Sequence, residues 1–316
     1  METPDDHFDG ERFFNPSGAG AQPLSAVPQM LVEPRRPWPA HIDTPLRQPA
    51  PLNGAAAVVT FIGHSSFLIQ TAEGNILTDP MYSERASPLS FVGPKRVRPA
   101  AVPFDDLPRI STVLLSHNHY DHCDRWTLSQ LARRFDPLVV TPLKNGPLLR
   151  SFGVRKVEEL DWWQASRAAA FPIALTPAHH FSARTPFDRN RALWGGFVFE
   201  VGGRRLYFAG DSAYAPFFSE IPQRLGAIDL ALLPIGAYEP RWFMQSVHMN
   251  PAEAVQVHLD VAASASIGMH FGTFRLTSEG IDEPLMALDD ACRARQVLPS
   301  SFRTLDFGES TRLERP

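Results

Sequence analysis

Residues 110–122, Ile-Ser-Thr-Val-Leu-Leu-Ser-His-Asn-His-Tyr-Asp-His, join an apolar run directly to the spacing His-x-His-x-Asp-His. The run Ile110–Leu115 is typical of a buried strand, because β-branched and aliphatic side chains dominate it. A loop leaving such a strand turns alternate imidazoles towards one point and the next side chains towards a second point nearby. The stretch therefore predicts two neighbouring metal ions at a strand end.

The types of donor in this stretch indicate which metals it would hold. Imidazole and carboxylate without thiolate favour Zn²⁺, with Mn²⁺ or Fe²⁺ as alternatives. A pair of such ions holds a bridging hydroxide that acts as a nucleophile. The competing interpretation is a set of hydrogen-bonded histidines without metal. Against it, the repulsion and desolvation of three His and one Asp would go uncompensated without a cation.

Length and composition limit the class of protein. The chain has 316 residues, 44% of them hydrophobic and 20% charged, which predicts a globular protein with a large core. A formal net charge of −4 provides no basic field for nucleic acid, so no nucleic-acid partner is expected and a nuclease is disfavoured. The two cysteines, Cys123 and Cys292, indicate a reducing compartment rather than a disulfide framework. Without an apolar signal segment, the expected location is the cytoplasm.

The chain divides into an N-terminal arm and one large domain. Residues 1–53 are rich in Pro, Gly and Ala and show no helical or strand period, which predicts an arm lying on the domain or partly disordered, with Trp38 as an anchor. We expect this arm to be dispensable for the metal core but to contribute to substrate or membrane access. Residues 54–316 form the predicted large domain, which carries the candidate metal ligands.

Within the domain, short apolar runs alternate with helical stretches, which favours helices covering a sheet. Helices are predicted over about 124–135, 145–152 and 251–261. Turns at Glu73-Gly74 and Gly202-Gly203 predict hairpins. The predicted strands are Ala57–Ile62, Ser66–Gln70, Asn75–Thr78, Ile110–Leu115, Leu138–Thr141, Ile173–Pro177, Leu193–Val201, Arg205–Ala209, Asp229–Leu233 and Ser266–Met269.

The candidate ligands stand at the ends of these strands, where a rigid sheet can build a site. His64, between two of the strands, has no partner at ligand spacing and is interpreted as a structural or supporting histidine. Cys123, directly after the motif, is interpreted as a small buried thiol rather than a ligand.

Seven stretches of the chain carry a family resemblance: Leu77-Thr78-Asp79-Pro80, Arg85-Ala86-Ser87-Pro88, Gly93-Pro94-Lys95-Arg96, Ser116 to His122, Leu160-Asp161-Trp162-Trp163, Phe208-Ala209-Gly210-Asp211 and the run Pro234 to Met244. Together they resemble the metallo-β-lactamase superfamily, and within it the branch of N-acylphosphatidylethanolamine-hydrolysing phospholipase D. The similarity covers about residues 55–310. It implies an α/β fold, the αββα sandwich of two mixed sheets flanked by helices, with a dinuclear metal site at one edge.

The resemblance also implies a set of metal ligands. His117, His119 and His180 would hold one zinc ion, and Asp121, His122 and His270 would hold a second. Asp211 would bridge the two ions. His179 is the alternative to its neighbour His180. A carboxylate at Asp211, where many true β-lactamases use a cysteine, counts against a β-lactam substrate.

The implied activity is phospholipase D-type hydrolysis of a phosphodiester in N-acylphosphatidylethanolamine-like lipids. Asp121 and Asp211 would orient the bridging hydroxide, and His248 would contact a phosphoryl oxygen. An apolar substrate would lie against Tyr238, Trp242, Phe243 and Met244.

Alternatives to this activity and its setting stay open. They are a lactonase or other small-molecule hydrolase of the same fold, and a metal-binding protein without turnover. Residues 17–34 are short and broken by Pro, unlike the apolar N-terminal region of the lipid-cleaving relatives. Two further possibilities concern the setting of the protein and not its activity. They are peripheral contact with the inner face of the membrane and formation of a homodimer.

Overall fold

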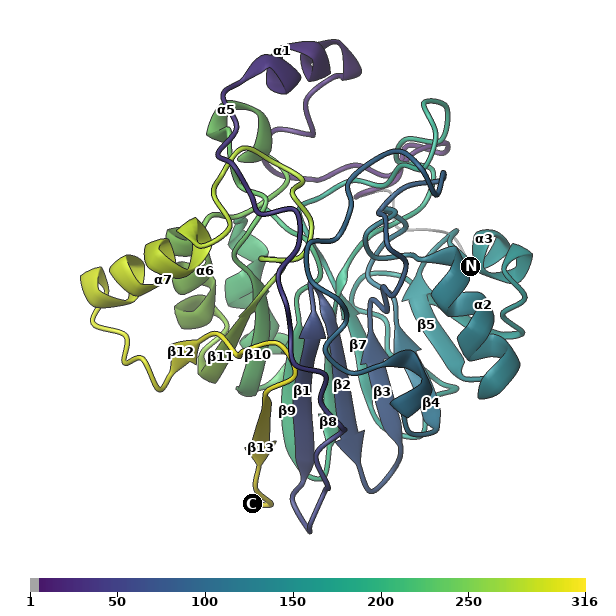
Figure 1. Ribbon diagram of the computed structural model, residues 1–316. Helices are drawn as coiled ribbons and strands as arrows, with labels where there is room; N and C mark the ends of the chain where they lie inside the picture. Colours follow the sequence, from purple (N-terminus) through teal and green to yellow (C-terminus); the bar gives the residue numbers. More distant parts are fainter. Residues whose placement is uncertain (1–5) are drawn as a thin grey trace.

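The computed structural model describes residues 6–316, so the first five residues of the predicted arm lie outside the described residues. Two mixed sheets lie face to face, and helices cover their outer faces (Figure 1). The predicted αββα sandwich is confirmed.

The first sheet has the strand order β13-β1-β2-β3-β4-β5-β6. Its strands β1, β2 and β3 are antiparallel, with β2 and β3 joined at the predicted Glu73-Gly74 turn, whereas β3 to β6 run parallel. The bounds are β1 Ala57–Gly63, β2 Ser66–Thr71, β3 Asn75–Thr78, β4 Ile110–Leu114, β5 Leu138–Pro142, β6 Lys156–Leu160 and β13 Ser310–Leu313.

The second sheet has the order β12-β11-β10-β9-β8-β7. Its antiparallel part contains the predicted hairpin of β8 and β9, which turns at Gly202 and Gly203, both at positive φ (56° and 77°). Strands β9 to β12 are parallel. The bounds are β7 Ile173–Thr176, β8 Gly196–Val201, β9 Arg204–Phe208, β10 Ile228–Pro234, β11 Ala263–Met269 and β12 Phe302–Arg303.

Two of the helices, α2 and α6, begin at side-chain caps. The side chain of Asp124 accepts hydrogen bonds from the Trp126 and Thr127 amides at the start of α2, as predicted. Asn250 and Glu253 form a capping box at the start of α6. The α-helices are α1 Val27–Val32, α2 Arg125–Arg134, α3 Gly146–Ser151, α4 Glu220–Leu225, α5 Arg241–Met244, α6 Pro251–Asp260 and α7 Glu283–Ala294, and 3-10 turns lie at Leu24–Ala26, Phe104–Asp106 and Pro216–Ser219.

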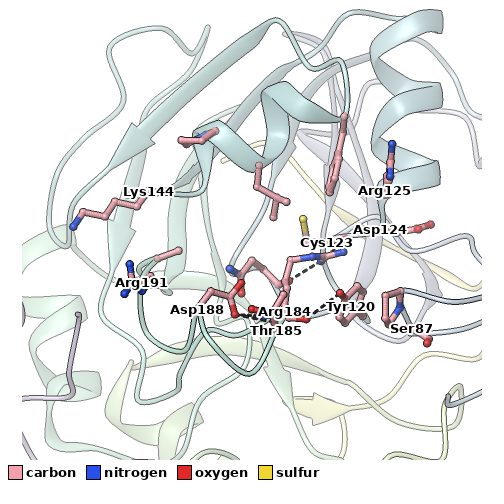
Figure 2. A pocket seen from close by; sticks show the side chains of 16 residues that line it. Ser87, Tyr120, Cys123, Asp124, Arg125, Lys144, Arg184, Thr185, Asp188 and Arg191 are labelled. Atoms are coloured by element: carbon pink, nitrogen blue, oxygen red, sulfur yellow. Dashed lines mark hydrogen bonds between the residues drawn. The ribbon is translucent and has the colours of Figure 1, made fainter. Parts of the chain in front are cut away.

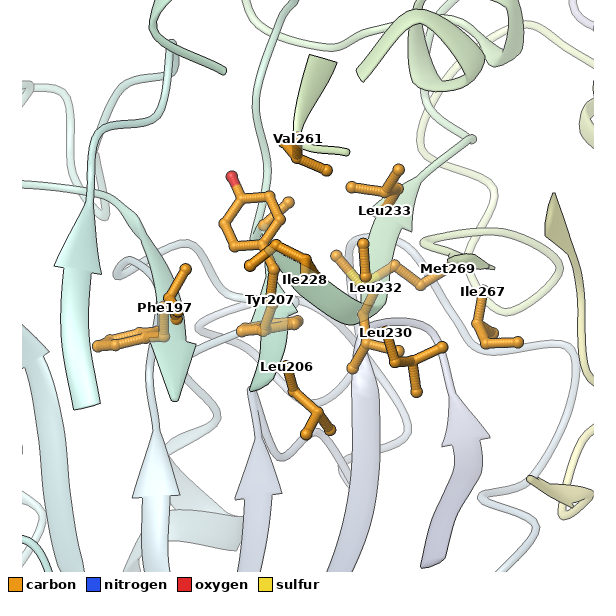
Figure 3. Packing of buried hydrophobic residues seen from close by; sticks show 14 of the residues in the cluster. Phe197, Leu206, Tyr207, Ile228, Leu230, Leu232, Leu233, Val261, Ile267 and Met269 are labelled. Atoms are coloured by element: carbon orange, nitrogen blue, oxygen red, sulfur yellow. The ribbon is translucent and has the colours of Figure 1, made fainter. Parts of the chain in front are cut away.

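Two hydrophobic clusters hold the layers together. The larger one fills the space between the sheets and extends under α6 and α7, with Phe197, Tyr207 and Leu232 all fully buried (Figure 3). The smaller one joins the outer face of the first sheet to α2, for example through Val113 and Leu131. Because both clusters exclude water, the strand ends that carry the candidate ligands are held rigidly.

The arm contains one short helix, α1, which the absence of a helical period in the sequence did not predict. This helix has six residues, carries Pro28 in its first turn and buries none of its side chains. A helix of this kind leaves no amphipathic pattern in the sequence, although proline favours the first helical turn.

The arm lies on the domain along much of its length. Phe13 is fully buried in the larger cluster. The indole Nε1 of Trp38 donates to the carbonyl of Glu279 at 2.9 Å, so the anticipated anchor is present. In Figure 1 the arm passes over the same end of the sheets as the metal-binding motif, and α1 sits above α5.

Candidate metal centre

The candidate ligands converge from both sheets. His117 follows β4 in the first sheet, while His180, Asp211 and His270 follow β7, β9 and β11 in the second. All of these positions lie just beyond the C-terminal ends of their strands, so the same edge of the sandwich collects them. Fixed strand ends of this kind set the distances between side chains.

One group consists of three histidines. Nε2 of His117 lies 2.9 Å from Nδ1 of His119, and Nε2 of His180 lies 3.2 Å from the same atom. Their donor atoms lie within 4.8 Å of one another, which is the arrangement a single metal ion requires.

A second group surrounds the carboxylate of Asp121. Its Oδ2 atom lies 3.4 Å from Nε2 of His122 and 3.4 Å from Nε2 of His270. His64 joins this group, with its Nε2 atom at 3.1 Å from the same oxygen. Sequence spacing alone could not show this proximity, because the turn at His64 and the end of β11 meet only in the folded chain, where the His270 amide donates to the His64 carbonyl.

Asp211 lies between the two groups. Its Oδ2 atom is 3.1 Å from His122 Nε2 and 3.2 Å from His270 Nε2. The same oxygen is 3.9 Å from Nε2 of both His117 and His180. One carboxylate is thus within reach of both groups, as a bridging ligand must be.

The donor set fits a cation. The Nε2 atoms of His122 and His270 and the Oδ1 atom of Asp211 are buried and have no hydrogen-bond partner. Buried polar atoms without partners are rare in native proteins and cost free energy. A metal pair at this position would satisfy them.

The histidine pKa values differ between the two groups. Burial lowers the pKa of His119 to about 3 and that of His180 to about 4, and it holds the pKa of His117 well below its usual value. These imidazoles are therefore neutral and offer lone pairs.

The pKa values of the second group shift the other way. Burial lowers the pKa of His270, but Asp211 and Asp121 outweigh it and raise that pKa to about 9. The pKa of His122 is raised well above its usual value in the same way, by Asp211, Asp121 and Asp79. Positive charge is therefore favoured beside the two carboxylates, whether protons or a metal ion supply it.

Asp79 contacts the candidate ligand His122. Sequence reasoning did not identify it as a functional residue. Its Oδ2 atom contacts Nδ1 of His122, and its Oδ1 atom accepts a hydrogen bond from the Ser116 amide at 2.7 Å. The available signal was a carboxylate placed directly after a strand, in Leu77-Thr78-Asp79-Pro80.

The adjacent pair His179 and His180 have different surroundings. His180 lies in the three-histidine group, and its Nδ1 atom donates to the Val247 carbonyl at 2.8 Å. His179 has its Nδ1 and Nε2 atoms at 3.0 and 2.6 Å from the carbonyls of Ser246 and Ser17. Both nitrogens of His179 are thus engaged with backbone, which leaves His180 as the better placed ligand.

His248 lies at the centre rather than on the surface. It is buried, and its Nε2 atom lies 3.8 Å from Asp211 Oδ2. Its Nδ1 atom is buried without a partner. Arg241 holds the surrounding loop by donating to the His248 carbonyl at 3.0 Å and to both carboxylate oxygens of Glu253.

Of the four residues predicted to bind an apolar substrate, Phe243 lines an apolar cavity of about 90 Å³. Phe181, which follows His180, lines the same cavity and places its ring 4.4 Å from that of His119. Trp242 is turned to the arm, where its Nε1 atom donates to Glu33 at 3.0 Å. Tyr238 and Met244 are buried and do not line this cavity.

A larger cavity of about 520 Å³ is lined in part by the loop at residues 116–123, here called the motif loop, but none of the candidate ligands lines it. Asn118, Tyr120 and Cys123 face it, together with Arg184 (Figure 2). Burial raises the pKa of the Cys123 thiol to about 12, and this thiol belongs to neither donor group.

Comparison with known proteins agrees with this geometry. Residues 74–271 match the Beta-lactamase superfamily domain. The chain therefore belongs to the metallo-β-lactamase superfamily and is a metal-dependent hydrolase of that fold. Within the superfamily it is 39% identical over 263 residues to N-acyl-phosphatidylethanolamine-hydrolyzing phospholipase D 1 of Caenorhabditis elegans, covering 79% of this chain and 74% of that protein.

Solved structures share the fold at low sequence identity. An isothiocyanate hydrolase from Delia radicum gut bacteria has a TM-score of 0.64 at 19% identity, covering 81% of this chain and 99% of that one. CmlA, a diiron β-hydroxylase from Streptomyces venezuelae, has a TM-score of 0.63 at 21% identity, covering 84% and 55%. Because different chemistries use this fold, the reaction must be argued from the site.

Proposed function

We propose that the protein is a phospholipase D-type phosphodiesterase that holds two zinc ions and acts on N-acylphosphatidylethanolamine-like lipids. The observation that carries this proposal is the position of Asp211, one carboxylate between two groups of donors. Paired metal sites of this design clamp the attacking and leaving oxygens of a phosphodiester. The C. elegans relative supports the lipid substrate.

In this proposal His117, His119 and His180 would hold the first ion. Asp121, His122 and His270 would hold the second, and Asp211 would serve both. Zinc suits these donors best, with Mn²⁺ or Fe²⁺ as alternatives. When bound, the metal pair lowers the pKa of a water molecule and neutralises phosphate charge.

The residues of the chain then orient the reactants. Asp121 and Asp211 stay ionised, because neighbouring histidines outweigh burial and hold both carboxyl pKa values well below their usual range. They position the attacking water by accepting its hydrogen bonds. His248, whose pKa burial lowers well below its usual value, offers a neutral N–H to a phosphoryl oxygen. The new bond forms between water oxygen and phosphorus as the water gives up a proton. The bond from phosphorus to the ethanolamine oxygen breaks, and that oxygen takes up a proton, which leaves phosphatidic acid and an N-acylethanolamine.

The apolar cavity beside the centre is proposed to receive part of an acyl chain. It is bounded by Phe181, Phe243 and Val247, and by Ala21 and Val27 of the arm. Its volume of about 90 Å³ is below the roughly 300–1,000 Å³ of pockets that enclose a whole ligand. A substrate that extends beyond the protein, such as a lipid in a bilayer, suits it.

Contact with the inner face of the membrane is proposed through an exposed apolar rim formed by Val32, Phe91 and Phe187. These side chains are 81%, 76% and 82% exposed and belong to α1 and to two loops. The loops of Phe91 and Phe187 flank the larger cavity, and the Phe187 loop also borders the smaller one. No helix within residues 6–316 is long and apolar enough to span a bilayer. Every candidate ligand comes from one chain, so the site does not require a homodimer.

A small-molecule hydrolase, such as a lactonase, is the second candidate, and the small volume of the apolar cavity favours it. A panel of N-acylphosphatidylethanolamines, lactones and bis-aryl phosphates separates the two, because a lactonase would open the lactones and leave the lipid intact. Turnover of none of them by zinc-loaded protein would favour a metal-binding protein without catalysis.

The decisive test combines metal analysis with isotope labelling. Protein never exposed to chelator should contain close to two zinc ions per chain, and Asp211→Ala should lose metal and activity together. Hydrolysis in ¹⁸O-labelled water should place the label in phosphatidic acid. Label in a released fatty acid, or less than one zinc per chain, would overturn the proposal.

A further inference from the structure

Arg184 connects two segments that carry candidate ligands. It lies four residues beyond His180, and its guanidinium reaches back to the motif loop (Figure 2). There its Nη1 atom donates to the carbonyl oxygens of Asn118 at 2.7 Å and Cys123 at 2.9 Å. These two carbonyls bracket the stretch that carries His119, Asp121 and His122.

Tyr120 completes the contact from the loop side. Its ring lies 3.8 Å from the Arg184 Cζ atom, and its hydroxyl donates to the Arg184 carbonyl at 3.0 Å. The two residues thus hold each other through side chain and backbone, and we call this contact the Arg184–Tyr120 clasp. Hydrogen bonds from a charged guanidinium are roughly twice as strong as neutral ones.

The far side of Arg184 is fixed as well. The carboxylate of Asp188 accepts hydrogen bonds from the amides of Arg184 at 3.0 Å and Thr185 at 2.8 Å. The turn after His180 is therefore constrained where the guanidinium leaves the backbone. Rotation of the arginine away from the loop would break several contacts at once.

The clasp matters because the three-histidine group is divided between the sheets. His117 and His119 come from the end of β4, whereas His180 comes from the end of β7. The Asn118 carbonyl that Arg184 binds belongs to the residue between His117 and His119. Apart from the contacts between the ligands themselves, hydrogen bonds made by Arg184 join the two segments.

We infer that Arg184 is a positioning residue that preforms the three-histidine site by holding the His180 segment against the motif loop. This inference rests on the metal centre of the proposed function and not on the lipid reaction. Residues that support metal ligands from outside commonly change metal affinity by about 10–100-fold when replaced. Arg184 would act in this way through the backbone of the motif loop.

The test compares Arg184→Met, which keeps much of the side-chain length but removes the donors, with Arg191→Met. Arg191 lines the same cavity and pairs with Glu11, so it controls for the loss of an arginine from that cavity. Zinc affinities are measured by chelator competition, and the cobalt-substituted proteins by their visible absorption. In Arg184→Met the affinity for one of the two zinc ions should fall by roughly 10–100-fold, and the visible absorption bands of the cobalt-substituted protein should change. Arg184→Lys should fall between it and the parent protein.

Several results would overturn the inference. Unchanged affinity and cobalt bands in folded Arg184→Met would do so, as would an equal effect in Arg191→Met. If Arg184→Met does not fold, Tyr120→Phe decides, because it removes one hydrogen bond and keeps the ring. That variant should weaken the same zinc by about two- to tenfold, and no change would overturn the inference. A parent protein that binds less than one zinc would instead contradict the proposed function.

Discussion

Nδ1 of His122 lies 2.7 Å from Oδ2 of Asp79, and neither side chain has any exposed surface. The contact fixes the ring so that Nε2 faces Asp211. Asp79 comes from the end of β3 and His122 from the loop after β4, so the parallel pairing of these strands creates the contact. Carboxylates in this position orient histidine ligands and raise their basicity.

Asp79→Asn should weaken metal binding by about 10–100-fold, because an amide cannot stabilise positive charge on His122. Chelator competition measures the change. Asp229→Asn, which disrupts a pair with Arg204 at the start of β10, is the control and should leave metal affinity unchanged. Equal affinities in parent and Asp79→Asn would show that Asp79 serves only the fold.

Phe13→Ala should lower the free energy of unfolding by about 3–5 kcal/mol, because it leaves a cavity in the larger cluster. Its neighbour Phe14 is 38% exposed, and Phe14→Ala should change stability by no more than about 0.5 kcal/mol. Urea unfolding of the two variants measures the difference. A chain starting near Gly54 loses Phe13 too, so the arm is dispensable only if that truncated chain still folds and binds zinc.

Docking of the arm should weaken at high pH. Burial lowers the pKa of His7, but hydrogen bonds with Asp161 and Asp6 outweigh it and raise that pKa above 6.5. A raised folded-state pKa gives stability that is present below about pH 6.5 and is lost as the pH rises through the folded value. Hydrogen exchange of residues 6–17 should therefore be slower at pH 6 than at pH 9, after correction for intrinsic rates.

His7→Gln provides the control for this pH effect. It cannot titrate, so its arm should show the same protection at both pH values. If the parent protein also showed equal protection, His7 would contribute no pH-dependent stability.

Replacing Phe243 should reduce the preference for long acyl chains. Each buried methylene contributes about 0.8 kcal/mol, or about fourfold in KM, as long as the cavity receives it. Phe243→Ala should flatten the dependence of KM on chain length. Trp242→Ala is the matched control, because Trp242 donates a hydrogen bond to Glu33 of the arm. This variant should leave the dependence of KM on chain length unchanged. If Trp242→Ala flattens this dependence and Phe243→Ala does not, the acyl chain lies against Trp242 instead.

Replacing two phenylalanines of the rim should weaken vesicle binding. Each phenylalanine that leaves water contributes about 1.5–3 kcal/mol, so Phe91→Ser with Phe187→Ser should reduce partitioning by at least about tenfold. Co-sedimentation with phospholipid vesicles measures this, and zinc content should stay constant. Met286→Ser, on α7 and 59% exposed in the parent, should have no effect. An equal loss of vesicle binding in the double variant and in Met286→Ser would show that the rim does not contact the membrane.

Local patterns predicted the elements whose signals are local. Strands β1 and β10 are predominantly apolar runs, interrupted only by Thr60 and Asp229, and α2 and α6 begin at Asp124 and Asn250, which the structure shows as caps. Strand β6, Lys156–Leu160, was missed because it is an edge strand with charged residues. Helix α7 was missed too, and its first turn contains a proline.

The centre shows the same division between local and non-local signals. The spacing of His117, His119, Asp121 and His122 lies within one loop, so the sequence alone predicts a metal site. The positions of His64 and Asp79 depend on the meeting of segments far apart in the chain. Arg184 likewise contacts residues more than sixty positions earlier. Such contacts follow from strand pairing, which one sequence does not specify.

The division of donors between two sheets has a consequence for synthesis on the ribosome. At roughly 5–20 residues per second, the segment from His122 to His270 takes roughly 7–30 s to translate. During that interval the candidate ligands of the loop at residues 116–122 are present, whereas His180, Asp211 and His270 follow one after another and His270 is last. The full set of candidate ligands can come together only after β11 has emerged and paired with β10, so the proposed metal centre would be completed after translation of the second sheet.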